Sequence, residues 1–456
     1  MTQTDDSATD EPITYTRVCA IALPVMLSNA TVPLQGAIDT AIIGNLGSEV
    51  FLAAVALGAA LFALYTGMFN FLHMSTSGLT AQALGAGVPR RVINTLIRGL
   101  IVAGVIAVVL FALQNPLTRL GLALFEGSAE AESLAATYFQ IRAIGFPAEL
   151  ANYALIGWFA GQELTRRLLE MQLIISVLNI MFNVFFVLGL GWGVEGVAIG
   201  TVLASYCGLA LGLWRAWSRG RMIAPKDWQV DWRRLLDRTE LTQVMSLNRD
   251  LFVRSLLLVI CFTWITRLGS LQGDTVLAAN GILILFLHIS AYALDGFAIA
   301  AETLVGQALG AGSLERLRRS VIVSSTAAVV LALVFSILAS LAARQLVNLF
   351  TNVEEVREVA MQYVLWATFM PLFGVLAFQM DGIFVGAAEG AGMRNAMIAS
   401  AAIFLPLSWV MTDALGNHGL WAATALLLLL RAAFLGFLYP ALEKRARCSA
   451  SAGAAT

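Results

Sequence analysis

Long apolar runs free of charged residues dominate this 456-residue chain. A helix that spans a bilayer needs about 20 mainly apolar residues. Ten stretches of 17 residues or more contain no Asp, Glu, Lys or Arg, and charged residues interrupt two further apolar segments, 133–160 and 241–269. The pattern therefore predicts twelve transmembrane helices and an all-α integral membrane protein. The ten uninterrupted stretches are Val18–Ile38, Val50–Pro89, Gly99–Thr118, Met171–Val194, Gly196–Trp214, Thr275–Leu294, Ser320–Ala343, Val359–Met380, Asn395–Thr412 and Ala414–Leu430.

Composition supports a membrane protein and excludes other classes. Charged residues make up 12% of the chain, about half of the roughly 25% found in soluble domains. With a net charge of -1, the chain lacks the excess of basic residues that is typical of proteins that bind nucleic acid. The N-terminal tail is acidic and has no basic segment before Arg17, so we expect the first span to be retained rather than cleaved as a signal peptide.

The distribution of basic residues predicts the orientation. Loops after even-numbered helices hold 15 Lys or Arg residues, and loops after odd-numbered helices hold 4. Positively charged loops stay on the cytoplasmic side. With an even number of helices, both termini are expected to face the cytoplasm.

An internal repeat divides the chain into two halves. Gln82–Gly87 and Gln307–Gly312 carry the same six residues, QALGAG, at an offset of 225. Pro147 and Pro371 repeat at nearly the same offset. Because six helices is an even number, both halves enter the membrane in the same direction, as in transporters built from parallel repeats. We expect two six-helix bundles related by pseudo-twofold symmetry, with helix ends and tight cytoplasmic turns at the QALGAG copies.

The repeat sets the expected domain boundaries. The longest charged loop separates the halves, and its Trp228 and Trp232 suit a segment at the membrane surface. The expected parts are an N-terminal six-helix bundle (1–217), a cytoplasmic linker (218–240), a C-terminal six-helix bundle (241–442) and a cytoplasmic tail (443–456).

Polar side chains recur at helical spacing inside the N-terminal half. An ionisable group at membrane depth costs roughly 2.5 to 3.5 kcal/mol on insertion scales and is a functional candidate. Asp39 is the one acid on these stripes, so we expect a wet, proton-accessible pocket around it; solvation of Asp39 at the outer end of its helix is the alternative. The stripes are Ser28, Thr31, Gln35 and Asp39 in the first helix, Thr66, Asn70, His73 and Ser77 in the second, Gln172, Ser176, Asn179 and Asn183 in the fifth, and Thr201 and Ser205 in the sixth.

Charges in the C-terminal half have open roles. At about 1.5 Å per residue, Asp295 reaches a depth similar to that of Arg249 and Arg254, so we expect Asp295 to pair with one of these two arginines. Asp250 and Arg254 are also spaced for an i,i+4 pair. Glu302 and Asp381 fit either ion or substrate contact or neutralisation of a nearby arginine.

The sequence offers little for a metal, cofactor or enzyme site. The four cysteines, Cys19, Cys207, Cys261 and Cys448, form no CxxC pair. The histidines are single, and the QALGAG copies lack the GxxxxGK[ST] pattern of a phosphate loop. We expect no cofactor and no metal site, and we find no clustered nucleophile that would indicate a membrane enzyme.

Together these motifs resemble the multidrug and toxic compound extrusion (MATE) transporters. The resemblance rests on twelve helices in two parallel halves, Asp39 on a first helix that contains Pro24 and Pro33, and the two QALGAG copies. Finer motifs are similar to the DinF-like branch: Asn248–Asp250 with Arg254–Leu256, Ala291–Phe297, Asp381–Ala387, Met393–Asn395 and Gly416–Trp421. The similarity covers about Thr14 to Leu442.

The resemblance implies a function and a site. It implies efflux of bulky, often cationic amphipathic compounds from a bacterial cell, across the inner membrane, in exchange for H+ or Na+. Asp39, Asn179 and Thr201 match the coupling site of the N-terminal half, and Asn183 stands at a further position of that site. From the polar stripes we expect Gln35, Asn70, His73, Ser176 and Ser205 to form a polar lining. Expected partners are drug-like small molecules and the lipid bilayer, with no nucleic acid, and we expect a monomer.

One difference from related transporters favours protons as the coupling ion. Several relatives carry a second Asp in the fifth helix, where this chain has Asn183. Hard cations bind best to several oxygens that include carboxylates, so a site with one carboxylate favours H+ over Na+. An exporter of lipids or organic anions is the alternative function and would use Arg98, Arg142 or Arg431 in its cavity. A channel would have no use for duplicated halves.

Overall fold

The computed structural model describes residues 12–44, 49–123, 128–224, 235 and 237–453, with backbone alone for 449–453. In this part of the chain, eleven helical segments are long and apolar enough to cross a membrane. The remaining expected span is broken in two, α6 (Ala129–Ala143) and α7 (Phe146–Ala160), each too short to cross alone. The all-α fold and the twelve expected spans are therefore confirmed, with interruptions in the second span, at the turn of residues 68–70, and in the fourth.

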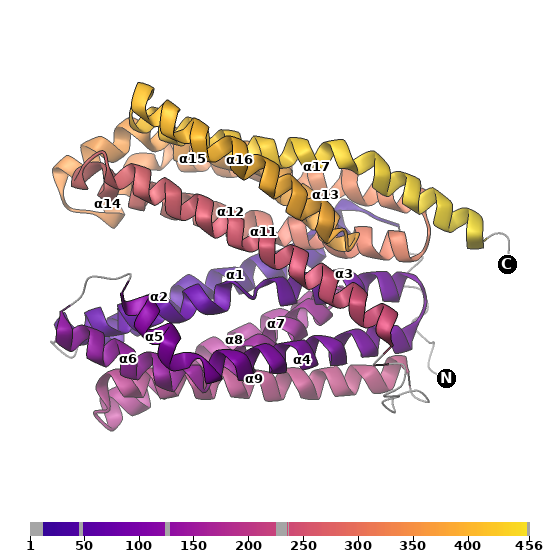
Figure 1. Cartoon of the computed structure of the whole chain (residues 1–456), viewed down its shortest axis with the longest axis horizontal. Coiled ribbons are helices and arrows are strands. Elements are labelled where there is room, and N and C mark those ends of the chain that lie inside the picture. Colours follow the sequence, from indigo (N-terminus) through magenta and orange to yellow (C-terminus); the bar gives the residue numbers. More distant parts are fainter. Residues whose placement is uncertain (1–11, 45–48, 124–127, 225–234, 236, 454–456) are drawn as a thin grey trace. The chain divides into compact units, whose positions relative to one another are not determined.

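Contacts group the chain into two compact units, and the first of these comprises Leu27–Thr80 and Val88–Thr242. We call it the N-unit; its helices are drawn from indigo to magenta in Figure 1. Ile42, Ile43, Val55 and Val197 share one of its cores. Its elements are the second part of α1 (Tyr15–Gly44), α2 (Glu49–Gly67), most of α3 (Phe71–Gly85), α4 (Pro89–Ala112), α5 (Gln114–Leu122), α6, α7, α8 (Thr165–Asn183), the π-helix η2 (Val184–Gly189) and α9 (Gly193–Ile223).

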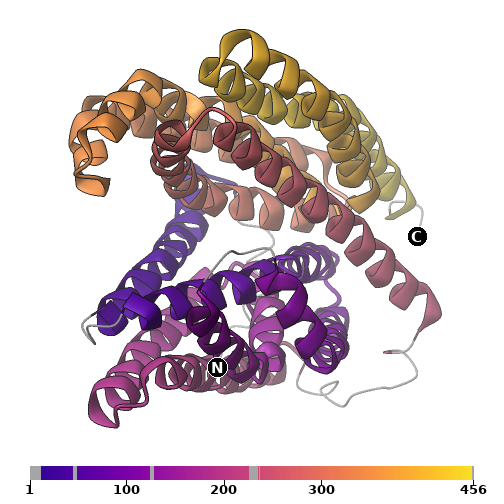
Figure 2. The same ribbon diagram turned by 60° about the vertical axis from the view of Figure 1, so that its left-hand side comes forward.

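The second unit comprises Met1–Met26, Ala81–Gly87 and Gln243–Thr456. We call it the C-unit. The first turns of α1 belong to it because Val18 and Ile21 pack with Leu294 and Phe297. Helices α16 and α17 lie side by side in both views (Figures 1 and 2). Its long helices are α11 (Arg238–Ser270), α12 (Asp274–Gly310), α13 (Leu314–Leu341), α14 (Ala343–Phe350), α15 (Glu354–Gly386), α16 (Gly390–Leu415) and α17 (Asn417–Gly453).

Helices extend into both segments expected to lie outside the bundles. Helix α9 continues to Ile223, inside the expected linker, and α17 continues to Gly453, inside the expected tail. Trp228 and Trp232 lie outside the described residues. The helical tail makes a contact of its own, since Arg445 donates to the carbonyl oxygen of Ala387 over 3.3 Å.

The two QALGAG copies end helices, as the repeat predicted. Helices α3 and α12 end at Gly85 and Gly310, and Gly87 and Gly312 follow with φ of +66° and +64°, the left-handed conformation that commonly terminates a helix. The copies also touch within the C-unit. A Cβ atom on Gly85 would collide with the backbone of Gln307, and one on Gly310 with the backbone of Gln82. This reciprocal close approach allows no side chain at either glycine.

We therefore expect Gly310→Ala to destabilise the protein by about 1–3 kcal/mol, because the methyl group overpacks a backbone contact that cannot rotate away. Gly436→Ala is the matched control, since a Cβ atom there meets nothing within 4 Å and a helical alanine is favourable. Thermal unfolding in detergent measures both. Equal midpoints for the two variants would contradict the close approach.

Candidate functional site

Asp39 is held near the C-terminal end of α1 by a buried asparagine. The Nδ2 group of Asn183, the last residue of α8, donates to Asp39 Oδ1 over 2.7 Å. The same Nδ2 lies 3.2 Å from Asn179 Oδ1, one turn earlier on α8. Asn179 and Asn183 are both fully buried. The carboxylate of Asp39 is therefore hydrogen-bonded to a side chain in the interior of the N-unit.

Helix α9 continues this row of polar groups. Asn179 Nδ2 donates to Thr201 Oγ1 over 2.8 Å, and the Thr201 hydroxyl donates to the carbonyl oxygen of Val197 over 2.8 Å. Three helices, α1, α8 and α9, thus supply one hydrogen-bonded chain from Asp39 to Thr201. The four residues that the sequence placed in a coupling site lie together.

Local features of the backbone shape this chain. Asn183 directly precedes the π-helix η2, a distortion often found at functional sites. Gly200 on α9 faces Asn183, and a Cβ atom there would collide with Asn183 Oδ1. That oxygen is buried and has no hydrogen-bond partner among the described residues. The missing side chain at 200 thus gives Asn183 the space in which it reaches Asp39.

Gly200→Ala is expected to displace Asn183 and lower proton-driven efflux at least about tenfold, since losing a hydrogen bond to a charged group costs about 1.5–3 kcal/mol. Gly104→Ala, where a Cβ atom meets nothing within 4 Å, is the control. Efflux of a fluorescent organic cation from reconstituted liposomes compares the two. Unchanged efflux in Gly200→Ala would show that the position of Asn183 does not matter.

The row extends past Thr201 to an acid to which the sequence alone assigned no role. One turn after Thr201, the Ser205 hydroxyl donates to Glu149 Oε2 over 3.2 Å. Asn152 Nδ2 donates to the Ser205 carbonyl oxygen over 3.1 Å. The signal in the sequence was the charge that interrupts an apolar segment beside Pro147.

Arg142 lies on α6, before the break that separates this helix from α7, whereas Glu149 lies after it. Its side chain is buried, and its guanidinium carbon lies 3.9 Å from the centre of the Phe62 ring. Nε and Nη1 of Arg142 have no hydrogen-bond partner among the described residues. The guanidinium is close enough to Asp39 for an electrostatic interaction. It therefore adds a positive charge to the environment of the coupling carboxylate.

Of the expected polar lining, part joins the row and part does not. The Ser176 hydroxyl donates to Gln35 Oε1 over 3.4 Å, which brings α8 and α1 together again. Asn70 is exposed at the turn between α2 and α3, and Nε2 of His73 is buried without a partner among the described residues. The turn at residues 68–70 interrupts the helical spacing, so the stripe expected along one continuous helix is not formed.

In the C-unit, two aspartates form ion pairs with the arginines. Asp250 Oδ1 lies 2.9 Å from Arg249 Nη2 and 2.6 Å from Arg394 Nη1, so the expected i,i+4 pair with Arg254 is not formed. Asp381 Oδ2 instead accepts from both Arg254 and Arg431. Asp381, Arg254 and Arg431 are all buried.

The expected pairing of Asp295 was wrong. Among the described residues Asp295 forms no ion pair, because Arg249 pairs with Asp250 and Arg254 with Asp381. Asp295 remains within electrostatic reach of Asp381, Arg254 and Arg431. Glu302 is buried further along α12. Equal depth along two helices did not establish that their side chains face each other.

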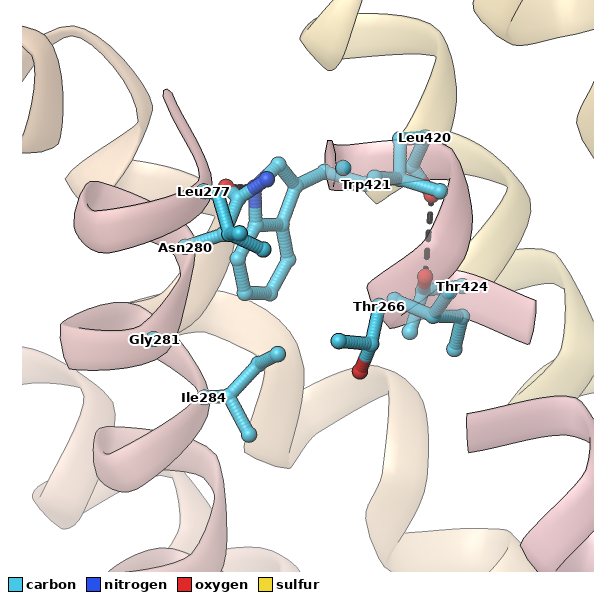
Figure 3. A pocket seen from close by; sticks show the side chains of 10 residues that line it. Thr266, Leu277, Asn280, Gly281, Ile284, Leu420, Trp421 and Thr424 are labelled. Carbon is cyan, nitrogen blue, oxygen red and sulfur yellow. Dashed lines mark hydrogen bonds between the residues drawn. The ribbon is translucent and has the colours of Figure 1, made fainter. Parts of the chain in front are cut away.

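A pocket of about 240 Å³ lies in the C-unit among α11, α12 and α17 (Figure 3). Leu277, Ile284 and Leu420 line it together with the indole ring of Trp421. Trp421 Nε1 donates to Asn280 Oδ1 over 2.9 Å. The lining carries no charged side chain, so this pocket is suited to apolar groups and does not extend the acidic site.

Comparisons with known proteins agree with this architecture. A family model described as MatE matches residues 24–185 and 251–410. The chain is 37% identical over 425 residues to the DNA damage-inducible protein F of Escherichia coli, covering 92% of this chain and 90% of that protein. It is 27% identical over 435 residues to a probable multidrug resistance protein NorM of Bradyrhizobium diazoefficiens, covering 89% of each.

A solved structure shows the same fold. An outward-facing conformation of a multidrug resistance MATE family transporter superposes with a TM-score of 0.85 at 19% identity, covering 97% of this chain and 100% of that one. The family model covers most of the chain, and the identity to the Escherichia coli protein extends over nearly its whole length. The chain is therefore a multi-pass membrane transporter, not an enzyme, and belongs to the MatE family as a DinF-like member.

Proposed function

We propose that this protein is a secondary active antiporter that exports amphipathic, often cationic organic compounds in exchange for protons. The observation that carries the proposal is the buried hydrogen-bonded chain from Asp39 through Asn183 and Asn179 to Thr201. We propose alternating access for the transport cycle, a bacterial inner-membrane location with both termini in the cytoplasm, and action as a monomer.

The geometry suggests how one proton could drive export. Ionised Asp39 accepts a charge-assisted hydrogen bond from Asn183, and such bonds are about twice as strong as neutral ones. A proton on Asp39 removes that charge and weakens the link between α1 and α8. It also removes the negative charge that attracts an organic cation. Proton and substrate therefore compete, and protonation from the outside favours substrate release there.

The donor set around Asp39 supports protons over sodium. Asn183 presents its NH₂ group to Asp39, so the amide nitrogen rather than an oxygen faces the carboxylate. Asn179 likewise presents its NH₂ group to Thr201. A hard cation needs several oxygens directed at one point. Both asparagines instead direct amide nitrogens at the neighbouring oxygens.

The arginines weigh against an anion exporter. Of the three arginines that could bind an anion, Arg98 pairs with Glu240 and Arg431 with Asp381. Arg98 is paired within the N-unit, and Arg431 shares one carboxylate with Arg254 within the C-unit. Buried Nε and Nη1 of Arg142 have no hydrogen-bond partner among the described residues, but Arg142 lies within electrostatic reach of an acid, Asp39.

The proposal is tested with purified protein in liposomes loaded with ethidium, a fluorescent organic cation. A proton gradient and a sodium gradient are imposed separately, with the membrane potential clamped. We expect the proton gradient alone to drive efflux. Efflux driven only by sodium would overturn proton coupling, and efflux under neither gradient would overturn the export of organic cations.

A further inference from the structure

We infer that Glu149 is a second acidic group of the coupling site and that Arg142 is the fixed positive charge that balances one of the two acids. The inference rests on the proposed function and extends it. With both acids ionised, the site has one net negative charge. It is then balanced by one proton or by one monovalent organic cation.

The position of Glu149 supports this role. Glu149 lies in the first turn of α7, directly after the break in the fourth span. Its carboxylate accepts from Ser205, and Ser205 lies one turn from Thr201 on the same face of α9. The polar row therefore begins at one carboxylate, Asp39, and ends at another, Glu149. Both acids belong to the N-unit.

Charged and titratable groups around Glu149 come from the helices packed beside it. Tyr153 on α7 is within electrostatic reach of both Glu149 and Arg142. Tyr138 on α6 is within reach of Arg142 and Asp39. Arg142 is thus the cation shared by this group of side chains, whereas the tyrosines are neutral when protonated.

Arg142 has the features of a counter-charge that is retained for electrostatic reasons. It is 8% exposed, and its Nε and Nη1 atoms make no hydrogen bond to the described residues. Leaving charged donors unpaired in a buried position costs free energy. The stacking on Phe62 stabilises the guanidinium only in part. A positive charge kept at this cost is explained by Asp39, which is within its electrostatic reach, and by Glu149, which shares the neighbour Tyr153 with Arg142.

Charge counting gives the exchange ratio of the site. Asp39 and Glu149 contribute two negative charges and Arg142 one positive charge. One proton or one organic cation brings the sum to zero, whereas binding both together leaves an excess positive charge at membrane depth, which is costly. Proton and cation binding are therefore mutually exclusive, and by linkage each displaces the other.

Glu149→Gln removes one acid and tests the inference directly. Ethidium is added to the purified protein in weakly buffered detergent, and the released protons are measured with a pH dye. We expect about one proton per bound cation for the unchanged protein and almost none for the variant. Proton-driven efflux should fall at least about tenfold. Glu195→Gln, an exposed position in α9, is the matched control.

A second variant separates a missing charge from a damaged fold. Asn183 is buried and contacts Asp39, so Asn183→Asp puts a carboxylate of nearly the same shape into the row. We expect the double variant Glu149→Gln with Asn183→Asp to regain proton release and efflux. Unchanged activity in Glu149→Gln, or failure of Asn183→Asp to restore it, overturns the inference. Loss of activity in Asp39→Asn with full activity in Glu149→Gln would overturn only this inference and leave the proposed function standing.

The counter-charge has its own test. Arg142→Gln leaves two negative charges, so the site should hold a proton more tightly. We expect half-maximal ethidium binding to move to higher pH by about one unit, while Arg142→Lys retains the original pH profile. An unshifted profile in Arg142→Gln would show that Arg142 does not balance these acids.

Discussion

Asp39→Asn is expected to abolish proton-driven export and leave the fold intact. The amide has nearly the same shape as the carboxyl group and can still accept a hydrogen bond from Asn183, which now donates to Asp39 Oδ1 over 2.7 Å. It cannot take up or release a proton at physiological pH. When one proton is exchanged for one monovalent cation, no net charge crosses the membrane. The pH difference then supplies the driving force, about 1.4 kcal/mol or a tenfold concentration gradient per pH unit. We expect that whole gradient to be lost.

The steady-state ratio of ethidium across energised vesicles measures this loss. Asp413→Asn makes the same substitution at an exposed position in α16 and should leave the ratio unchanged. Size-exclusion chromatography and circular dichroism check that both variants fold. A folded Asp39→Asn protein that still builds the gradient would place proton coupling elsewhere.

Asp381→Asn should have the largest effect on stability. Asp381 accepts from both Arg254 and Arg431, and all three side chains are buried. Removing one partner of a buried ion pair typically destabilises a protein by about 3–5 kcal/mol, because a buried charge is left without compensation. Here two guanidinium groups lose their shared carboxylate. Asp295 remains within electrostatic reach of both arginines but forms no ion pair with them.

Thermal unfolding in detergent tests this expectation, again with Asp413→Asn as the control. We expect a sharply lower midpoint for Asp381→Asn, together with poor expression. A midpoint equal to that of the control would mean that the three buried charges contribute nothing to the stability of the C-unit.

The sequence predicted the spans well because a single strong signal determines them. Runs without charged residues are long enough to cross a bilayer only as helices, and most of each predicted span lies within helices. Helices α12 and α17 continue well past the predicted ends, to Gly310 and Gly453. The break at Ile144 and Gly145 between α6 and α7 was not predicted. Its sign was the pair of charges, Arg142 and Glu149, on either side of it.

The candidate site was predicted where helical spacing is uninterrupted. Asn179 and Asn183 lie one turn apart on α8 and reach Thr201 and Asp39. The same reasoning did not apply to Asn70 and His73, because a turn separates α2 from α3. Spacing along one helix predicts a shared face, but only while the helix continues.

The sequence alone did not predict which residues of distant helices form ion pairs with each other. Asp381 on α15 binds Arg254 on α11 and Arg431 on α17. Depth along the membrane suggested Asp295 for Arg254, since both lie at similar levels. Which helices are neighbours depends on packing across the bundle, and one sequence does not contain that information in its local pattern.

The most direct test of the central claim is the movement of protons driven by substrate alone. Liposomes containing the protein and an enclosed pH dye are placed at equal pH inside and outside, with the membrane potential clamped, and ethidium is added outside. Antiport predicts that the lumen becomes alkaline as ethidium enters and protons leave, and that Asp39→Asn removes this response. Entry of ethidium with no change in lumenal pH would contradict proton exchange.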